Sequence, residues 1–212
     1  MAELTLYAES EWVSPWAFHA MVALEEKRLA YDLQVVPLPI PDDKRATVVE
    51  HAVLGKIPVL VHGDLWITES LAISEYLAER FPFPAHPRIF PADLGERARA
   101  RQVMSFLRTS SFALRDDRPT SSVFGPPTNK PLSDKAKLEA AEIVRIAERL
   151  IAPGKTTMFA DWSIADADFA LMLMRLVHNN DPVPTHVIDY TLSQWQRPSI
   201  REFLSHVPTR PD

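Results

Sequence analysis

The chain has 212 residues, of which 46% are hydrophobic and 24% charged, so it can bury the core of one large or two small globular domains. Its net charge of −5 gives no reason to expect a nucleic-acid partner, because such a partner requires a clustered basic surface. The absence of cysteine excludes Cys-x-x-Cys redox exchange and cysteine nucleophiles, so any thiol chemistry needs a thiol supplied by a ligand.

The first part of the chain alternates between strand and helix patterns. Residues 4–7 alternate as a short strand, and a helix is expected to begin at Ser14-Pro15. Serine at this position caps a free backbone N–H, and proline loses nothing at the first helical position. A second strand is expected over residues 31–38, followed by a weaker helix pattern over 42–53.

A β-hairpin and a third helix come next. Residues 58–61 and 65–68 are separated by His62-Gly63-Asp64, which contains the expected turn residues. A helix is expected from Glu69 or Ser70 to Arg80. The helix between the first two strands predicts a parallel pair, and the hairpin adds antiparallel strands, so we expect a mixed sheet.

A proline-rich segment, residues 82–91, marks the predicted domain boundary, because neither helix nor sheet runs through four prolines. The helix after Ser163 is apolar nearly all round, which predicts the buried centre of a second domain. The rest of the chain is expected to be helical apart from a loop at 120–132, with helices at about 92–117, 133–152, 163–178, 185–195 and 198–206.

Three short motifs have residue types that suit chemistry. Ser14-Pro15-Trp16 opens the first helix, Gly55-Lys56-Ile57-Pro58 leads into the hairpin, and Glu69-Ser70 opens the third helix. Each motif also has a purely structural interpretation. The first would be an N-cap, the second a turn before an edge strand, and the third a pair of first-turn residues that complement the helix dipole. The seven histidines show no metal-ligand spacing, so no metal site is predicted.

The order and spacing of these motifs resemble those of the glutathione transferase superfamily over nearly the whole chain. Ser163-Ile164-Ala165-Asp166 matches the capping box of that family, and residues 195–199 resemble its C-terminal segment. The run at 97–102, with Arg118-Pro119 and Val123-Phe124, is most similar to the bacterial YfcF-type members.

The resemblance implies a cytosolic glutathione transferase fold. Residues 1–81 are expected to form a thioredoxin-like α/β domain that binds glutathione, and 82–91 a linker. Residues 92–212 are expected to form an all-α domain that shapes the electrophile pocket, with the active site in the cleft between the domains. A homodimer is implied as well. The start of the chain lacks a signal-peptide pattern and no apolar run approaches 20 residues, so we expect a cytoplasmic protein with no membrane partner.

The family places a serine or tyrosine hydroxyl near the end of the first strand or the start of the first helix. This hydroxyl donates to the glutathione sulfur and favours the thiolate. Ser14 occupies that place in this sequence, and Tyr7 at the end of the first strand is the alternative. Trp16, Phe106 and Phe112 fit either an electrophile pocket or a hydrophobic core.

The other two motifs are expected to bind glutathione, the co-substrate. Ser70 at a helix N-terminus offers its hydroxyl and N–H to the γ-glutamyl carboxylate, and Glu69 accepts from the α-amino group. A cis bond before Pro58 turns the N–H and C=O of Ile57 toward the cysteinyl backbone. Lys56 is expected to meet the glycine carboxylate.

Conjugation of glutathione to hydrophobic electrophiles is the leading function, accompanied by glutathione-dependent peroxide reduction with the same thiolate. Two alternatives stay open: glutathione-dependent disulfide exchange, and a non-enzymatic interaction or stress module that keeps the fold without turnover. An isomerase of the maleylacetoacetate type is disfavoured, because its usual Ser-Ser-Cys start is absent.

Overall fold

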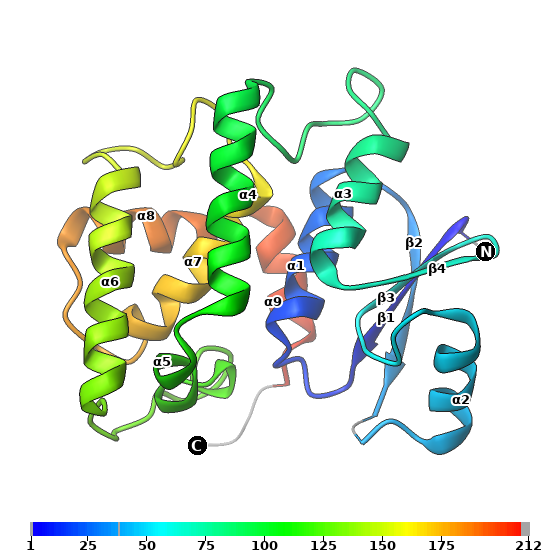
Figure 1. The fold of residues 1–212 in the computed structure, drawn as a ribbon, viewed down its shortest axis with the longest axis horizontal. Helices are drawn as coiled ribbons and strands as arrows, with labels where there is room; N and C mark the ends of the chain where they lie inside the picture. Colours follow the sequence, from blue (N-terminus) through cyan, green and yellow to red (C-terminus); the bar gives the residue numbers. More distant parts are fainter. Residues whose placement is uncertain (1, 38, 209–212) are drawn as a thin grey trace. The chain divides into compact units, whose positions relative to one another are not determined.

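The computed structural model describes residues 2–37 and 39–208, which divide into two compact units (Figure 1). Unit 1 contains the chain up to Ile89 together with Ser205–Pro208, and unit 2 contains Phe90–Leu204. The division therefore falls inside the proline-rich segment 82–91. Leu38, the last residue of the predicted second strand, lies outside the described residues.

Unit 1 is built on a four-stranded sheet in the order β2-β1-β3-β4. Its strands are β1 (Leu4–Glu9), β2 (Tyr31–Val36), β3 (Val59–His62) and β4 (Leu65–Thr68). β1 and β2 are parallel, because a helix connects them, and the other two pairs are antiparallel. The predicted mixed sheet is confirmed.

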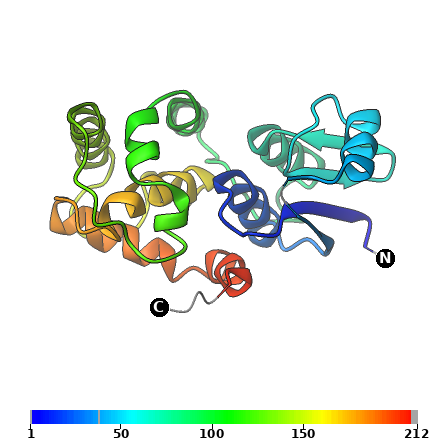
Figure 2. The same cartoon turned by 90° about the horizontal axis from the view of Figure 1, so that it is seen from below.

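Helices cover both faces of this sheet (Figures 1 and 2). α1 (Pro15–Glu26) and α3 (Ser70–Arg80) pack against each other on one side, and α2 (Asp42–His51) lies on the other. Along β1, Leu4 and Leu6 are buried, whereas the alternating pleat points Tyr7 to the opposite face. That opposite face is the one covered by α2, because Tyr7 belongs to its hydrophobic cluster.

Unit 2 is helical, as the sequence predicts. Its centre is α7 (Ile164–Val177), which is buried from Ile164 to Leu176 and packs against α4 and α8. The remaining helices are α4 (Leu94–Thr109), α5 (Phe112–Asp117), α6 (Asp134–Leu150), α8 (Thr185–Trp195) and α9 (Pro198–His206), with a short 3-10 turn at Thr120–Ser122. The last two residues of α9, Ser205 and His206, belong to unit 1. None of the described helices is long and apolar enough to cross a bilayer.

The predicted single helix over 92–117 is wrong, because the chain breaks at Ser110 and Ser111. Ser110 is extended and Ser111 has φ of 58°, in the left-handed region. The hydroxyls of Thr109 and Ser110 donate to the carbonyls of Ser105 and Phe106. Such side-chain bonds offer the backbone an alternative to the helical ladder, so a run of three hydroxyl residues ends α4 and lets α5 begin.

The predicted bond from the Ser163 N–H back to Asp166 is confirmed at the start of α7. The buried Asp166 carboxylate accepts from the Ser163 N–H at 2.8 Å, the Met158 N–H at 2.8 Å and the Tyr190 hydroxyl at 2.9 Å. Burial raises the pKa of this carboxyl, and the hydrogen bonds oppose that shift. Asp166 therefore ties α7, α8 and the preceding loop together.

Candidate functional site

Three loops of unit 1 meet at one end of its sheet. Tyr7 of β1 pairs with Val59 of β3, and Val59 pairs with Thr68 of β4. The C-terminal end of β1, the N-terminal end of β3 and the C-terminal end of β4 therefore coincide. The loop after β1, the loop before β3 and the residues after β4 emerge side by side.

These three loops carry the three predicted motifs. Ser14 follows β1 and remains tied to its end, because the Ser14 N–H donates to the Glu9 carboxylate at 2.8 Å. Ile57-Pro58 immediately precedes β3, and Glu69-Ser70 immediately follows β4. The fold thus brings together residues that are up to 56 positions apart, counting from Ser14 to Ser70.

Ser14 is the N-cap of α1, and its hydroxyl retains a free proton. The oxygen accepts from the N–H groups of Trp16 at 3.3 Å and Ala17 at 3.2 Å. A serine hydroxyl has two acceptor lone pairs and one donor proton. Both lone pairs are engaged, and no acceptor for the proton occurs in the described residues. The capping role and a donor role are therefore compatible in one side chain, at the positive end of a helix.

Tyr7 lies in a stack of aromatic rings beneath α2. Its ring centroid is 5.5 Å from that of Trp66 with an interplanar angle of 27°, and Trp66 stacks on His51 at 5.1 Å. The same cluster includes Val48 and Val59. The position of the Tyr7 ring is thus explained by packing.

The peptide bond between Ile57 and Pro58 is cis, as predicted. The N–H and C=O of Ile57 have no hydrogen-bond partner within residues 2–37 and 39–208, so both are available to a ligand backbone. Lys56 is exposed, and its ammonium makes no ion pair within the same part of the chain.

Glu69 and Ser70 form the start of α3. Glu69 is exposed, has φ of 67° and makes no capping bond with its side chain. A non-glycine residue in this region carries about 1–3 kcal/mol of backbone strain, and such residues concentrate at functional sites. Ser70 is the first residue of the helix and is 3% exposed. An acidic side chain and a helix N-terminus thus lie next to each other at the same end of the sheet.

Glu9 was not among the residues predicted from the sequence, and it is buried at 3% exposure. Its carboxylate accepts from the backbone N–H groups of Glu11, Val13 and Ser14. The available signal was an acidic residue at the end of an apolar strand, directly before the loop that leads to the predicted helix start at Ser14.

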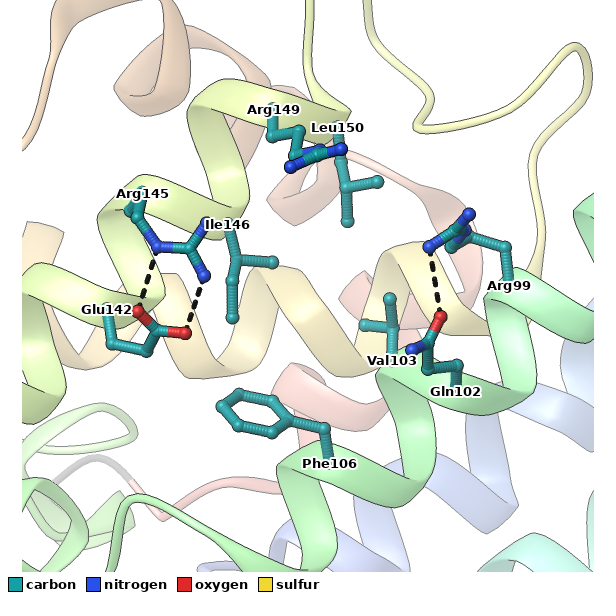
Figure 3. Close-up of a pocket in the computed structure, with 9 residues that line it drawn as sticks. All are labelled: Arg99, Gln102, Val103, Phe106, Glu142, Arg145, Ile146, Arg149 and Leu150. Carbon is teal, nitrogen blue, oxygen red and sulfur yellow. Dashed lines mark hydrogen bonds and ion pairs between the residues drawn. The ribbon is translucent and has the colours of Figure 1, made fainter.

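A separate pocket of about 510 Å³ lies within unit 2, between α4 and α6 (Figure 3). Phe106, Val103 and Ile146 form apolar parts of its wall, and the arginines 99, 145 and 149 lie around it. Arg99 donates to Gln102, and Arg145 donates twice to Glu142. Of the three aromatic residues considered from the sequence, Phe106 alone lines this pocket, and Phe112 is 55% exposed on α5.

Comparison with known proteins assigns both parts of the chain to one family. Residues 93–208 match the family model "Glutathione S-transferase, C-terminal domain", and residues 13–80 match "Glutathione S-transferase, N-terminal domain". Two Arabidopsis thaliana relatives, glutathione S-transferases U13 and T1, are each 34% identical, over 50% and 56% of this chain. The matched segment covers 45% of the length of each relative.

Solved structures match over almost the whole chain. A glutathione transferase homologue from Burkholderia, solved with bound glutathione, is 34% identical with a TM-score of 0.78, over 96% of this chain and 97% of that one. A theta class enzyme from Xanthomonas axonopodis pv. citri has the same fold, with a TM-score of 0.72 at 18% identity over 96% and 98% of the two chains. The chain belongs to the glutathione S-transferase family.

Proposed function

We propose that this protein is a glutathione transferase of the YfcF type, in which the Ser14 hydroxyl activates the glutathione thiol for attack on hydrophobic electrophiles. Peroxide reduction with the same thiolate accompanies this activity. The observation that carries the proposal is the free proton on the Ser14 hydroxyl, whose two lone pairs are held by N–H groups of α1. That proton has a ligand sulfur as its natural acceptor.

The chemistry follows from the charge on sulfur. A free thiol has a pKa of about 8.5, so little thiolate is present at neutral pH. A hydroxyl that donates to the sulfur binds the charged form better than the neutral one, and the N-terminus of α1 acts in the same direction. The bound thiol then loses its proton to solvent. Its sulfur forms a bond to the electrophilic carbon as the leaving group departs with its electron pair.

The two neighbouring loops hold the rest of glutathione. Ser70 and the first N–H groups of α3 bind the γ-glutamyl carboxylate, and Glu69 accepts from the α-amino group. The free N–H and C=O of Ile57 pair with the cysteinyl backbone in the manner of an added strand. The exposed ammonium of Lys56 meets the glycine carboxylate. All four residues lie at the end of the sheet where Ser14 is held.

The proposal extends to the other parts of the molecule. Residues 1–81 act as the glutathione-binding domain, 82–91 as a linker, and 92–212 shape the pocket for the electrophile. The protein works in the cytoplasm as a homodimer.

Two single variants test the assignment of the hydroxyl. Ser14→Ala removes a hydrogen bond to a charged group, so the conjugation rate at neutral pH should fall by about 10- to 150-fold. The pKa of bound glutathione should rise while its affinity stays nearly unchanged, and part of the lost rate should return at higher pH. Tyr7→Phe is the matched control and should change little. A shift of the acidic limb of the pH–rate profile in Tyr7→Phe, with none in Ser14→Ala, would reverse the two roles.

The reaction itself is tested with three substrates, each offered with glutathione: a chloronitrobenzene, an organic hydroperoxide and a mixed disulfide. Turnover of the first two supports the proposal. Turnover of the disulfide alone would identify a disulfide oxidoreductase, and glutathione binding without any turnover would identify a non-enzymatic module.

A further inference from the structure

We propose that Glu9 is a positioning residue, whose buried carboxylate fixes the Ser14 hydroxyl in the orientation needed to donate to the glutathione sulfur. This inference rests on the proposed role of Ser14. Glu9 acts on the reaction through Ser14 and touches no reacting atom.

The contacts of Glu9 are those of an anion held in a backbone cradle. One carboxylate oxygen accepts from the Val13 N–H at 2.7 Å and the Ser14 N–H at 2.8 Å. The other accepts from the Glu11 N–H at 2.7 Å. Concavities formed by successive backbone N–H groups bind anions in many proteins. Here the anion is a side chain of the same chain, and the cradle is the loop that leads to Ser14.

This loop contains a backbone conformation that depends on such support. Trp12 has φ of 51°, which is unfavourable for a large side chain. The N–H groups on either side of it, from Glu11 and Val13, both donate to Glu9. The Trp12 indole is 5% exposed and stacks on His206 with a centroid distance of 4.5 Å and an angle of 15°. The carboxylate and the stacked ring therefore hold the loop at two different points.

The geometry at Ser14 shows why its N–H matters. Ser14 is the residue at which the loop becomes a helix, with φ of −73° and ψ of 119°. Its N–H is fixed by Glu9, and its oxygen is fixed by the N–H groups of Trp16 and Ala17. Because the Ser14 backbone and both lone pairs of its oxygen are held, the hydroxyl proton can point in only one remaining direction. If the N–H is released, the serine side chain can rotate away from the sulfur.

Loss of the Glu9 charge and loss of its positioning role change the thiol pKa of bound glutathione in opposite directions, so the sign of the change tests the inference. A negative carboxylate near a sulfur disfavours the thiolate, so loss of the Glu9 charge would by itself lower the pKa of the thiol. Loss of positioning instead raises this pKa, because the thiolate loses its donor.

Glu9→Gln keeps the size of the side chain and replaces one acceptor oxygen by an NH₂ group, which cannot accept from an N–H. The thiol pKa of bound glutathione, followed by thiolate absorbance, should rise toward its value in Ser14→Ala. The conjugation rate at neutral pH should fall by up to about 100-fold, as a displacement on the order of 1 Å would cause. Glutathione affinity should change by less than about threefold, because the other contacts lie on separate loops.

Glu11→Gln is the matched control. It removes the same charge from the same loop, but the Glu11 side chain is exposed and has no partner in the described part of the chain. Its rate and thiol pKa should equal those of the parent protein. In the Ser14→Ala background, Glu9→Gln should have no further effect beyond about twofold, because a positioning residue has nothing left to position.

The possible results separate this inference from the function on which it rests. If Ser14→Ala raises the thiol pKa while Glu9→Gln leaves it unchanged or lowers it, the inference is wrong and the proposed function stands. If Ser14→Ala leaves the thiol pKa of bound glutathione unchanged, both the proposed role of Ser14 and this inference are wrong. Should Glu9→Gln not fold, Glu9→Asp keeps the charge but not the reach and should show a smaller pKa rise. Failure of both variants to fold would assign Glu9 to stability alone.

Discussion

Replacing Asp166 by alanine removes the acceptor of four buried donors: the N–H groups of Met158 and Ser163 and the hydroxyls of Ser163 and Tyr190. Each buried donor left without a partner costs about 1 kcal/mol or more. The variant should therefore lose about 4 kcal/mol, a large part of a typical stability of about 5–15 kcal/mol. For a chain of this length, 1 kcal/mol corresponds to about 2–4 °C, so the melting temperature should fall by about 8–16 °C.

Urea unfolding followed by far-ultraviolet circular dichroism measures this loss. Asp161→Ala is the matched control, because Asp161 is exposed and has no hydrogen-bond partner within the described residues. It should shift stability by less than about 0.5 kcal/mol. Tyr190→Phe should cost about 1 kcal/mol alone and nothing further in the Asp166→Ala background. The reasoning is refuted if Asp166→Ala unfolds at the same urea concentration as Asp161→Ala.

Two further predictions concern unit 1. In the proposed site, Ser70→Ala and Glu69→Gln each remove a partner of a charged group of glutathione, so calorimetry should show affinity losses of about 1.5–3 kcal/mol. Unchanged affinity in both variants would show that glutathione does not bind at these residues. The second concerns Glu3, which lies 2.5 Å from the His62 ring. The hydrogen bond from His62 holds the pKa of the Glu3 carboxyl below its ordinary 4.5, so its contribution to stability is present above that pH and lost as the pH falls through the lowered value. Glu3→Gln should therefore unfold at lower urea than the parent near neutral pH, and this difference should shrink as the pH falls below 4.5. A difference that stays equal across this pH range would contradict the prediction.

Local patterns in the sequence were sufficient for much of the fold. The alternation at 4–7, the hairpin around Gly63 and the serine and proline at the start of α1 each act within a few residues, and the structure has these elements where they were expected. The break between α4 and α5 was missed, because the apolar periodicity continues through it and the competing bonds of Thr109 and Ser110 depend on rotamers.

The candidate site likewise has residues that were predicted from the sequence and one that was not. The three motifs were found by their order along the chain, and their proximity follows from strand pairing. Glu9 could not be identified in this way, because its importance depends on a loop closing around its carboxylate. No spacing rule describes an acidic side chain that binds backbone N–H groups two, four and five residues further on.

The stacking of Trp12 on His206 has a consequence for how this protein is made. Ser205–Pro208 belong to the same compact unit as the first 89 residues, so that unit is discontinuous in the chain. A ribosome adds about 5–20 residues per second, so the interval between Ile89 and Ser205 is on the order of ten seconds. During that time the loop before Ser14 lacks the ring that covers its indole. The nascent chain must therefore keep an incomplete first domain in solution until Ser205–Pro208 have been synthesised, and a fragment cut at the linker would remain in that state.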